Sequence, residues 1–209
     1  MNAALTAKIL AKRAKADYKN ACTGIQRFLA NKNEKRFVTA MATGLESESI
    51  EHYLNMWRST STTKLNKINC LAMKNILGTE IDLQNILWMY RLKKYYGIFG
   101  DSSYGFLIPI RYRLSDNVFS NLVNCTSIEN FISELSKTIY HNVFGNFLFA
   151  QQSLTKAVKL RYRTESRRSY IALACGYLYE AHLQEKNKAA MAEGIRHGLD
   201  HSEILSRLY

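Results

Sequence analysis

Two acidic residues in the middle of the chain are the first candidates for chemistry. Glu80 and Asp82 are close in sequence, and paired carboxylates are the usual groups for general acid–base catalysis. On a helix, however, residues two positions apart point away from one another. The apolar residues around them predict that a carboxylate here needs a hydrogen-bonded partner. We therefore interpret Asp82, together with Asn85 three positions further on, as a polar pin between helices.

A second candidate lies near the end of the chain, where Glu193, His197 and His201 have the four-residue spacing of a helical metal site. Gly198 stands between the two histidines and is expected to end the helix, which favours solvated or capping histidines. The sequence has no glycine-rich loop that ends in Lys-Ser or Lys-Thr, the pattern that cradles phosphate groups. We accordingly expect no catalytic residue, no metal ligand and no cofactor.

These residues must be positioned by helices, because composition and the spacing of apolar residues both favour an all-α fold. The 209 residues include ten Gly and one Pro, and 47% are hydrophobic, which excludes disordered and collagen-like chains. The single proline favours long, uninterrupted helices over a turn-rich β protein. An apolar face recurs at helical spacing near the N-terminus. It comprises Ala3, Ala7, Leu10, Ala14, Ala21, Ile25 and Phe28.

Gly, Asn, Ser and the lone proline indicate where the helices end. Interruptions are expected near residues 31–33, 43–49, 59–63, 97–112, 125–127 and 197–201. Ser115 and Ser127 each precede an acidic residue and an apolar run, so each is expected to cap a short helix. The stretch 97–112 is the longest predicted loop, and residues 106–112 could pair locally.

The net charge of +12 comes from two segments. Residues 1–36 hold nine basic and two acidic residues, residues 156–168 hold six basic and one acidic residue, and the remainder is neutral. A solvated charged surface is the simplest interpretation, and docking on an acidic partner or a polyanion is the functional one. Each segment places four basic residues on one helical face: Lys8, Lys12, Lys15 and Lys19, and then Lys156, Lys159, Arg163 and Arg167.

Cysteine usage and the apolar runs bear on the compartment. The cysteines lie about fifty residues apart, which suggests buried, reduced side chains and no clustered zinc or redox site. Lys8 interrupts any apolar core of a secretory signal, and no apolar run approaches the roughly 18 residues of a membrane span. We therefore expect a cytoplasmic protein. The cysteines are Cys22, Cys70, Cys125 and Cys175.

A near-repeat relates two segments about one hundred residues apart. Residues 80–85 lead to a glycine at position 97, and residues 182–187 lead to a glycine at position 198. Asn85 lies 12 residues before its glycine and Asn187 lies 11 before its own. Such a match predicts repeated helical hairpins. It also adds Asn187 and Glu80 to the predicted polar pin.

These segments resemble a known family. The resemblance is carried by residues 80–85 with the following 86–96, by Leu107-Ile108-Pro109, Leu114, residues 127–135 and 137–140, and near the C-terminus by residues 177–187, 193–195, 198–199 and 203–204 with Leu208. Over roughly residues 45–209, the chain is similar to the C/d family of V-type and A-type ATPase subunits, which are called C in archaea and bacteria and d in eukaryotic V-ATPases.

The resemblance implies a non-catalytic, all-helical protein that connects the central stalk to the membrane rotor ring on its cytoplasmic face. That role couples ATP hydrolysis or synthesis to ion transport. The family has three similar helical domains, so this shorter chain would hold about two of the three. We expect an N-terminal basic helix with short helices in residues 1–60, packing with the next repeat. Residues 61–150 would form the first family-like repeat and residues 151–209 the last.

Two functions from different classes follow from these observations. The first is the connecting subunit of a rotary ATPase, whose partners are the stalk and ring subunits, with peripheral contact to the membrane surface. The second is a basic helical nucleic-acid-binding protein, suggested by the charge of +12. The sequence contains no recognisable helix-turn-helix or aromatic ribonucleoprotein motif, which ranks the second well behind the first.

Overall fold

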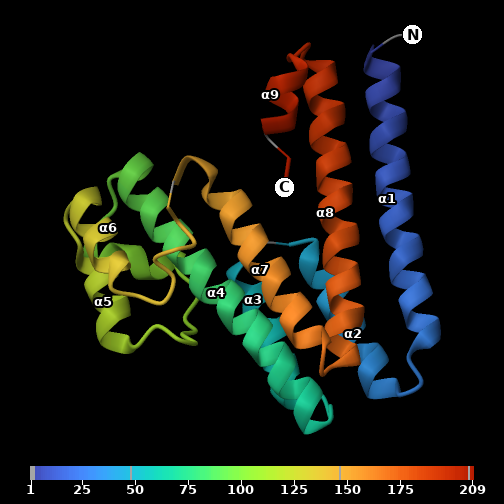
Figure 1. The fold of residues 1–209 in the computed structure, drawn as a ribbon, viewed down its shortest axis with the longest axis horizontal. Helices are drawn as coiled ribbons and strands as arrows, with labels where there is room; N and C mark the ends of the chain where they lie inside the picture. Colours follow the sequence, from blue (N-terminus) through green and yellow to red (C-terminus); the bar gives the residue numbers. More distant parts are fainter. Residues whose placement is uncertain (1–2, 48, 146, 207) are drawn as a thin grey trace.

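In the computed structural model, which describes residues 3–47, 49–145, 147–206 and 208–209, the chain is all-α (Figure 1). No strand is found in these ranges, which confirms the predicted fold class. The longer helices are α1 (Ala3–Phe28), α2 (Lys32–Leu45), α3 (Ile50–Thr62), α4 (Lys67–Tyr96), α7 (Ala150–Ser166) and α8 (Tyr170–Arg196). The shorter ones are η1 (Gly100–Phe106), α5 (Asp116–Asn124), α6 (Ile128–Ser136), η2 (Phe147–Phe149) and α9 (His201–Ser206).

The helix ends agree with the predicted interruptions, and polar caps explain most of them. The hydroxyl of Ser115 accepts a hydrogen bond from the Val118 amide at 3.4 Å, and that of Ser127 accepts one from the Asn130 amide at 3.1 Å. Both predicted caps are therefore confirmed. Two breaks are not among the predicted ones, the one between α6 and α7 and the one between α7 and α8. At the second, Ser169 begins α8 by accepting from the Ala172 amide at 3.0 Å.

Helix α4 is the centre of the molecule. Every residue from 76 to 87 is buried, polar ones included. Helices α3, α6, α7 and α8 and the 3₁₀ helix η1 all contact α4. A helix enclosed on all sides cannot hide its polar residues on a solvent face, so each needs a partner within the protein.

Helices α1, α8 and α9 lie on the side of the molecule away from α5 and α6 (Figure 1). Helix α1 runs antiparallel to α8, and α8 lies between α1 and α7 (Figure 1). The sequence predicts that the N-terminal helix packs on residues 61–150, but its most extensive contacts are with α8. Ala7 and Ala14 on α1 are buried, and small side chains of this kind allow two long helices to approach closely. The division into residues 1–60, 61–150 and 151–209 stays a prediction.

The predicted apolar face of α1 is correct in its middle and wrong at its end. Ala7 and Ala14 are buried, Leu10, Ala21 and Ile25 are partly buried, and the side chain of Ala3 is not among those described. Phe28, in contrast, is 86% exposed, and its neighbour Leu29 is buried. Phe28 is the last residue of α1, and the backbone turns there toward α2, so the helical spacing no longer applies.

Two helical glycines give opposite predictions for stability. A Cβ at Gly78 of α4 would overlap the ring of Tyr112, whereas one at Gly24 of α1 would meet nothing within 4 Å. Gly78→Ala is expected to lower the free energy of unfolding by about 1–3 kcal/mol because the core there has no spare room. Gly24→Ala is expected to raise it by about 0.5–1 kcal/mol through helix propensity. Urea unfolding followed by circular dichroism tests both, and a stabilising Gly78→Ala would contradict the packing.

Candidate functional site

Asp82 lies at the centre of the buried segment of α4, where its carboxylate receives three hydrogen bonds. The backbone amides of Tyr112 and Arg113 donate to its two oxygens at 3.0 and 2.7 Å, and the Tyr140 hydroxyl donates at 2.8 Å. Burial raises the pKa of Asp82, and the bonds from Arg113, Tyr112 and Tyr140 oppose that rise without cancelling it. The carboxylate thus holds the segment after η1 and the residues after α6 against α4.

Asn85, one helical turn further on, holds the same segment through its side-chain amide. Its Oδ1 accepts from the Ile108 amide at 2.8 Å, and its Nδ2 donates to the carbonyls of Ile108 at 3.0 Å and Ile110 at 3.4 Å. The amide group thereby pairs with extended backbone as a neighbouring strand would. This explains why residues 106–112 have the pattern of a locally paired segment although they form no strand. We propose that Asp82 and Asn85 act together as one structural pin.

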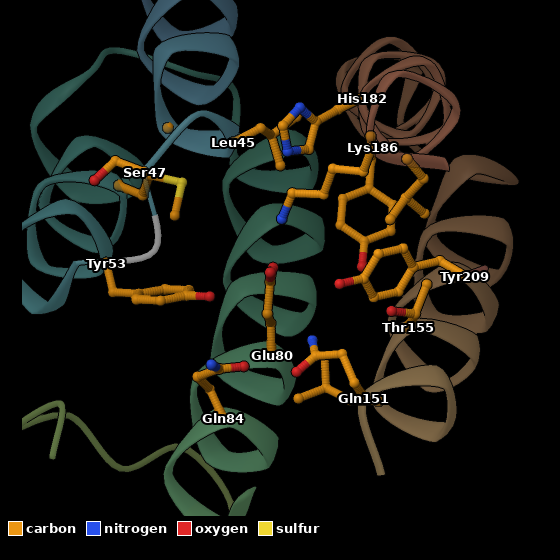
Figure 2. A pocket seen from close by; sticks show the side chains of 15 residues that line it. Leu45, Ser47, Tyr53, Glu80, Gln84, Gln151, Thr155, His182, Lys186 and Tyr209 are labelled. Atoms are coloured by element: carbon orange, nitrogen blue, oxygen red, sulfur yellow. The ribbon is translucent and has the colours of Figure 1, made fainter. Parts of the chain in front are cut away.

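Glu80 faces another part of the molecule, so it does not join Asp82 in an acidic pair. It lines a cavity of about 40 Å³ between α2, α3, α4, α7 and α8, and Figure 2 shows Glu80 and Lys186 pointing into it. Tyr53, His182 and Tyr209 contribute further polar walls. The cavity has room for a few water molecules. Glu80 is therefore part of a buried polar cluster between helices and lies apart from the pin at residues 107–113.

Asn187 repeats on α8 what Asn85 does on α4. Its Oδ1 accepts from the backbone amide of Tyr209 at 2.8 Å, and its Nδ2 donates to the carbonyl of the same residue at 3.3 Å. The two asparagines of the near-repeat thus each hold a later, extended part of the chain by both amide atoms. His182 and Gln184 stand where Glu80 and Asp82 stand in the first copy, so the carboxylate contacts are not reproduced.

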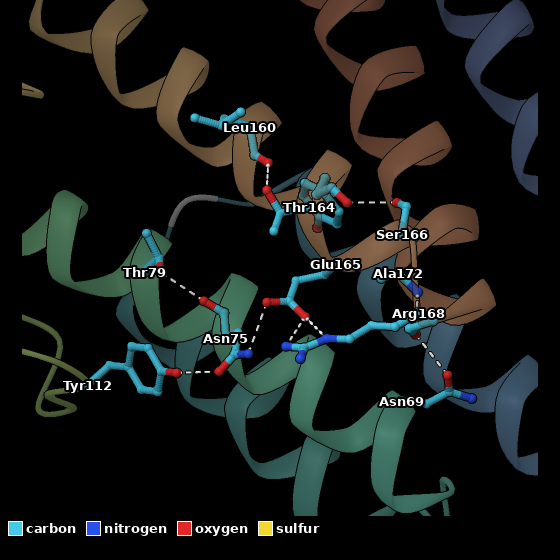
Figure 3. Close-up of polar contacts among 12 residues, drawn as sticks. Asn69, Asn75, Thr79, Tyr112, Leu160, Thr164, Glu165, Ser166, Arg168 and Ala172 are labelled. Carbon is cyan, nitrogen blue, oxygen red and sulfur yellow. Dashed lines mark hydrogen bonds and ion pairs between the residues drawn. The ribbon is translucent and has the colours of Figure 1, made fainter.

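A second polar network on α4 is absent from the sequence predictions (Figure 3). Asn75 accepts from the Tyr112 hydroxyl and donates to Glu165 of α7 at 2.9 Å. Glu165 is buried and also accepts from Arg168 at 2.7 Å. The network joins the 107–113 segment to the turn between α7 and α8. Its sequence signal is the one acidic residue inside the basic segment 156–168, which is the kind of position that pairs with a neighbouring arginine.

Lys93, near the end of α4, is a buried cation that the sequence pattern also misses. Its ammonium group donates to the carbonyls of Val123 at 2.6 Å and Cys125 at 2.9 Å, at the C-terminal end of α5. These carbonyls have no partner within their own helix and carry partial negative charge. Burial lowers the pKa of Lys93, and this contact compensates the cation for its lost hydration.

The structure does not bring the two predicted basic faces together. On α1, Lys8, Lys12, Lys15 and Lys19 are exposed, and Lys15 and Lys19 line a groove toward α2. On α7, the basic face lines a groove toward α8, with Lys156, Arg163 and Arg167 exposed and Lys159 half-buried in an ion pair with Glu180 at 3.1 Å. The faces therefore offer two separate charged surfaces, and their role in docking stays a prediction.

The end of α8 separates the two histidines near the C-terminus, as expected. Helix α8 ends at Arg196, Gly198 takes a φ of 67°, and His201 begins α9. His197 contacts Glu193 at 3.2 Å. In the part of the chain that the structure describes, no three His, Cys, Asp or Glu side chains gather as metal ligands would. The four cysteines are free.

Comparison with known proteins gives one finding. A model of the ATP synthase (C/AC39) subunit family matches residues 10–207, nearly the whole chain. The match begins 35 residues earlier than the resemblance seen in the sequence and so takes in most of α1. Searches of curated proteins and of solved structures found no match. Among the described helices, none is both long and apolar enough to cross a membrane.

The pin predicts a pH-dependent effect of Asp82→Asn. A carboxyl group keeps two acceptor oxygens whether ionised or neutral, whereas the amide replaces one of them with an NH2 group that faces the donors. The variant is therefore expected to lose about 1–3 kcal/mol of unfolding free energy. Because the folded-state pKa of Asp82 is raised, its contribution is fully present below the unfolded pKa of about 3.9 and is lost as the pH rises through the folded value. The difference between wild type and variant should therefore be larger at about pH 4 than at about pH 7. Urea unfolding at both pH values measures it, and a difference that grows with pH would contradict this assignment.

Lys93→Met is expected to destabilise the protein by about 1–3 kcal/mol because it leaves the carbonyls at the end of α5 without a donor. The neighbouring Lys94 is exposed, so Lys94→Met is the matched control and should change stability by less than about 0.5 kcal/mol. Thermal unfolding compares the two variants. Equal losses would show that the buried ammonium group does not support α5.

Proposed function

Because the chain belongs to the ATP synthase (C/AC39) subunit family, we propose that it is a non-catalytic connector between the central stalk and the membrane rotor ring of a rotary A/V-type ATPase. The observation that carries the proposal is the family match over residues 10–207. In this role the protein lies on the cytoplasmic face of the membrane. It couples ATP hydrolysis or synthesis to ion transport by transmitting rotation.

The internal structure suits a part that must pass on torque. Side chains of α4 make hydrogen bonds to three other parts of the chain: the 107–113 segment, the turn between α7 and α8, and the end of α5. Hydrogen bonds have a defined length and direction, so buried ones fix the angles between helices more closely than apolar packing alone. A body built in this way moves as a unit when one of its faces is pushed.

The two basic faces supply surfaces for docking. Positive charge on α1 and on α7 would meet acidic surfaces of neighbouring subunits or anionic lipid headgroups at the membrane. The near-repeat occurs at α4 and at α8, and we propose that these two helices correspond to two of the family's three repeats. The same charge of +12 motivates the competing function of nucleic-acid binding.

Co-purification tests the proposal. The protein, expressed with an affinity tag in its native cells, is expected to bring down rotary ATPase subunits from gently solubilised membranes. The variant in which Lys8, Lys12, Lys15 and Lys19 are changed to Glu should recover several-fold less of these subunits, because rim charges set association rates. The control changes Lys64, Lys67, Lys94 and Lys137 to Glu, with the same change in net charge.

Two outcomes would reject the connector. One is recovery of the protein free of every ATPase subunit and of the membrane. The other is tight binding to nucleic acid that weakens steeply with added salt, as phosphate contacts require, in a protein that does not associate with the ATPase. Equal recovery by the α1 variant and its control would reject the docking role of α1 alone.

A further inference from the structure

Three large apolar side chains are exposed on α8 and at the end of its neighbour α1. Phe28 at the end of α1 is 86% exposed, and Leu173 and Tyr177 on α8 are 59% and 56% exposed. Scattered apolar residues are normal on a protein surface, but a group that lines a groove marks an interaction site. We call this surface, with Gly24, Arg163 and Arg167 beside it, the Tyr177 face.

The Tyr177 face consists of two adjoining grooves. One, of about 490 Å³, lies between α1 and α8 and includes Gly24 and Phe28. The other, of about 470 Å³, lies between α7 and α8 and includes Arg163, Arg167 and Leu173. Tyr177 lines both, so its ring forms the ridge between them. Gly24 keeps the floor of the first groove open, since a Cβ there would meet nothing within 4 Å.

The charge beside these grooves is unbalanced. Their two carboxylates are already paired within the chain, Asp17 with Lys188 at 2.7 Å and Glu180 with Lys159 at 3.1 Å. Arg163 and Arg167 are exposed, and among the described residues neither has an ion pair or a side-chain hydrogen bond. The face thus offers an apolar centre with two available guanidinium groups on one edge. Its complement is an apolar stripe flanked by carboxylates.

We propose that the Tyr177 face binds an acidic amphipathic helix of a partner protein. An amphipathic helix inserts side chains at positions i, i+3, i+4 and i+7 into grooves, which suits a concave surface on either side of a ridge. A bilayer is flat and would contact the ridge and leave the grooves empty. The inference rests on the proposed function only in that the expected partner is another subunit of the rotary ATPase.

A photo-cross-linker at the ridge identifies what covers it. Tyr177 is replaced by p-benzoylphenylalanine in the full chain, the cells are irradiated, and the cross-linked peptides are sequenced by mass spectrometry. The expected product is a cross-link to one protein segment with apolar residues at helical spacing and an excess of Asp and Glu. The same cross-linker at Ala11, an exposed position of α1 that lines neither groove, is the control.

Two variants then test the face with a synthetic peptide of the cross-linked sequence. Gly24→Trp places a large side chain in the first groove from a position where a Cβ meets no atom of the fold within 4 Å. It should weaken peptide binding about tenfold or more while the helix content stays unchanged. Arg163→Gln with Arg167→Gln should weaken binding several-fold and reduce its dependence on salt. Ala11→Trp should leave binding unchanged.

The outcomes separate this inference from the proposed function. A cross-link to an acidic amphipathic segment of a protein that is not an ATPase subunit would support helix binding at the Tyr177 face and count against the proposed connector role. A lipid adduct, a cross-link to a basic or extended segment, or the same products from position 11 would reject the binding of an acidic helix at the Tyr177 face. None of these results bears on the connector role, which co-purification tests separately. Unchanged affinity in Gly24→Trp also overturns it.

Discussion

A buried carboxylate has to be matched by hydrogen-bond donors, and in this protein the match at Asp82 determines how the chain around it is arranged. The donors are two successive backbone amides and one tyrosine hydroxyl, and they belong to parts of the chain that follow Asp82 by 30 to 58 residues. Those partly buried amides lie outside any helix or strand, so no regular backbone partner is available to them. The Asp82 carboxylate therefore pairs the two loop amides, and these amides in turn compensate the carboxylate for its lost hydration.

The same principle is used along the whole of α4. Asn85 pairs with the backbone of the loop as a strand would, Asn75 connects the loop to α7 through Glu165, and Lys93 caps α5. Each of these side chains ends at a different element, and each lies on a helix that solvent reaches only at its ends. A loop that packs against a buried helix needs such contacts, because its extended backbone does not pair its own amides.

Local features of the fold could be predicted from the sequence, whereas long-range pairings could not. Helix ends followed from Ser, Asn and Gly because caps depend on a few neighbouring residues, as Ser115 and Gly198 show. The burial of Asp82 and Asn85 followed from the apolar residues around them. Their partners did not, because nothing in residues 107–113 indicates which helix they will meet. Lys93 was missed because a charged residue in a charged segment gives no sign that it will be buried, and Glu165 was missed although its isolation among basic residues favours an ion pair.

The near-repeat gains a physical meaning from the two asparagines. Asn85 and Asn187 each use both amide atoms to hold one later backbone residue, although their neighbours differ. A bidentate amide contact depends on one side chain and on the spacing to the end of the helix, so it can be kept while surrounding residues change. The Tyr177 face and the basic faces are formed by other residues, on α1, on α7 and in the first half of α8, and they do not take part in these two asparagine contacts.

The central claim is that α4 side chains, in place of a strand, satisfy the backbone of the 107–113 segment. Hydrogen exchange of the Ile108, Tyr112 and Arg113 amides, followed by nuclear magnetic resonance, tests it most directly. If Asn85 and Asp82 hold these amides, they should exchange as slowly as the amides in the middle of α4, which open only on global unfolding. Exchange as fast as that of the exposed residues Ser102 and Gly105 would contradict it.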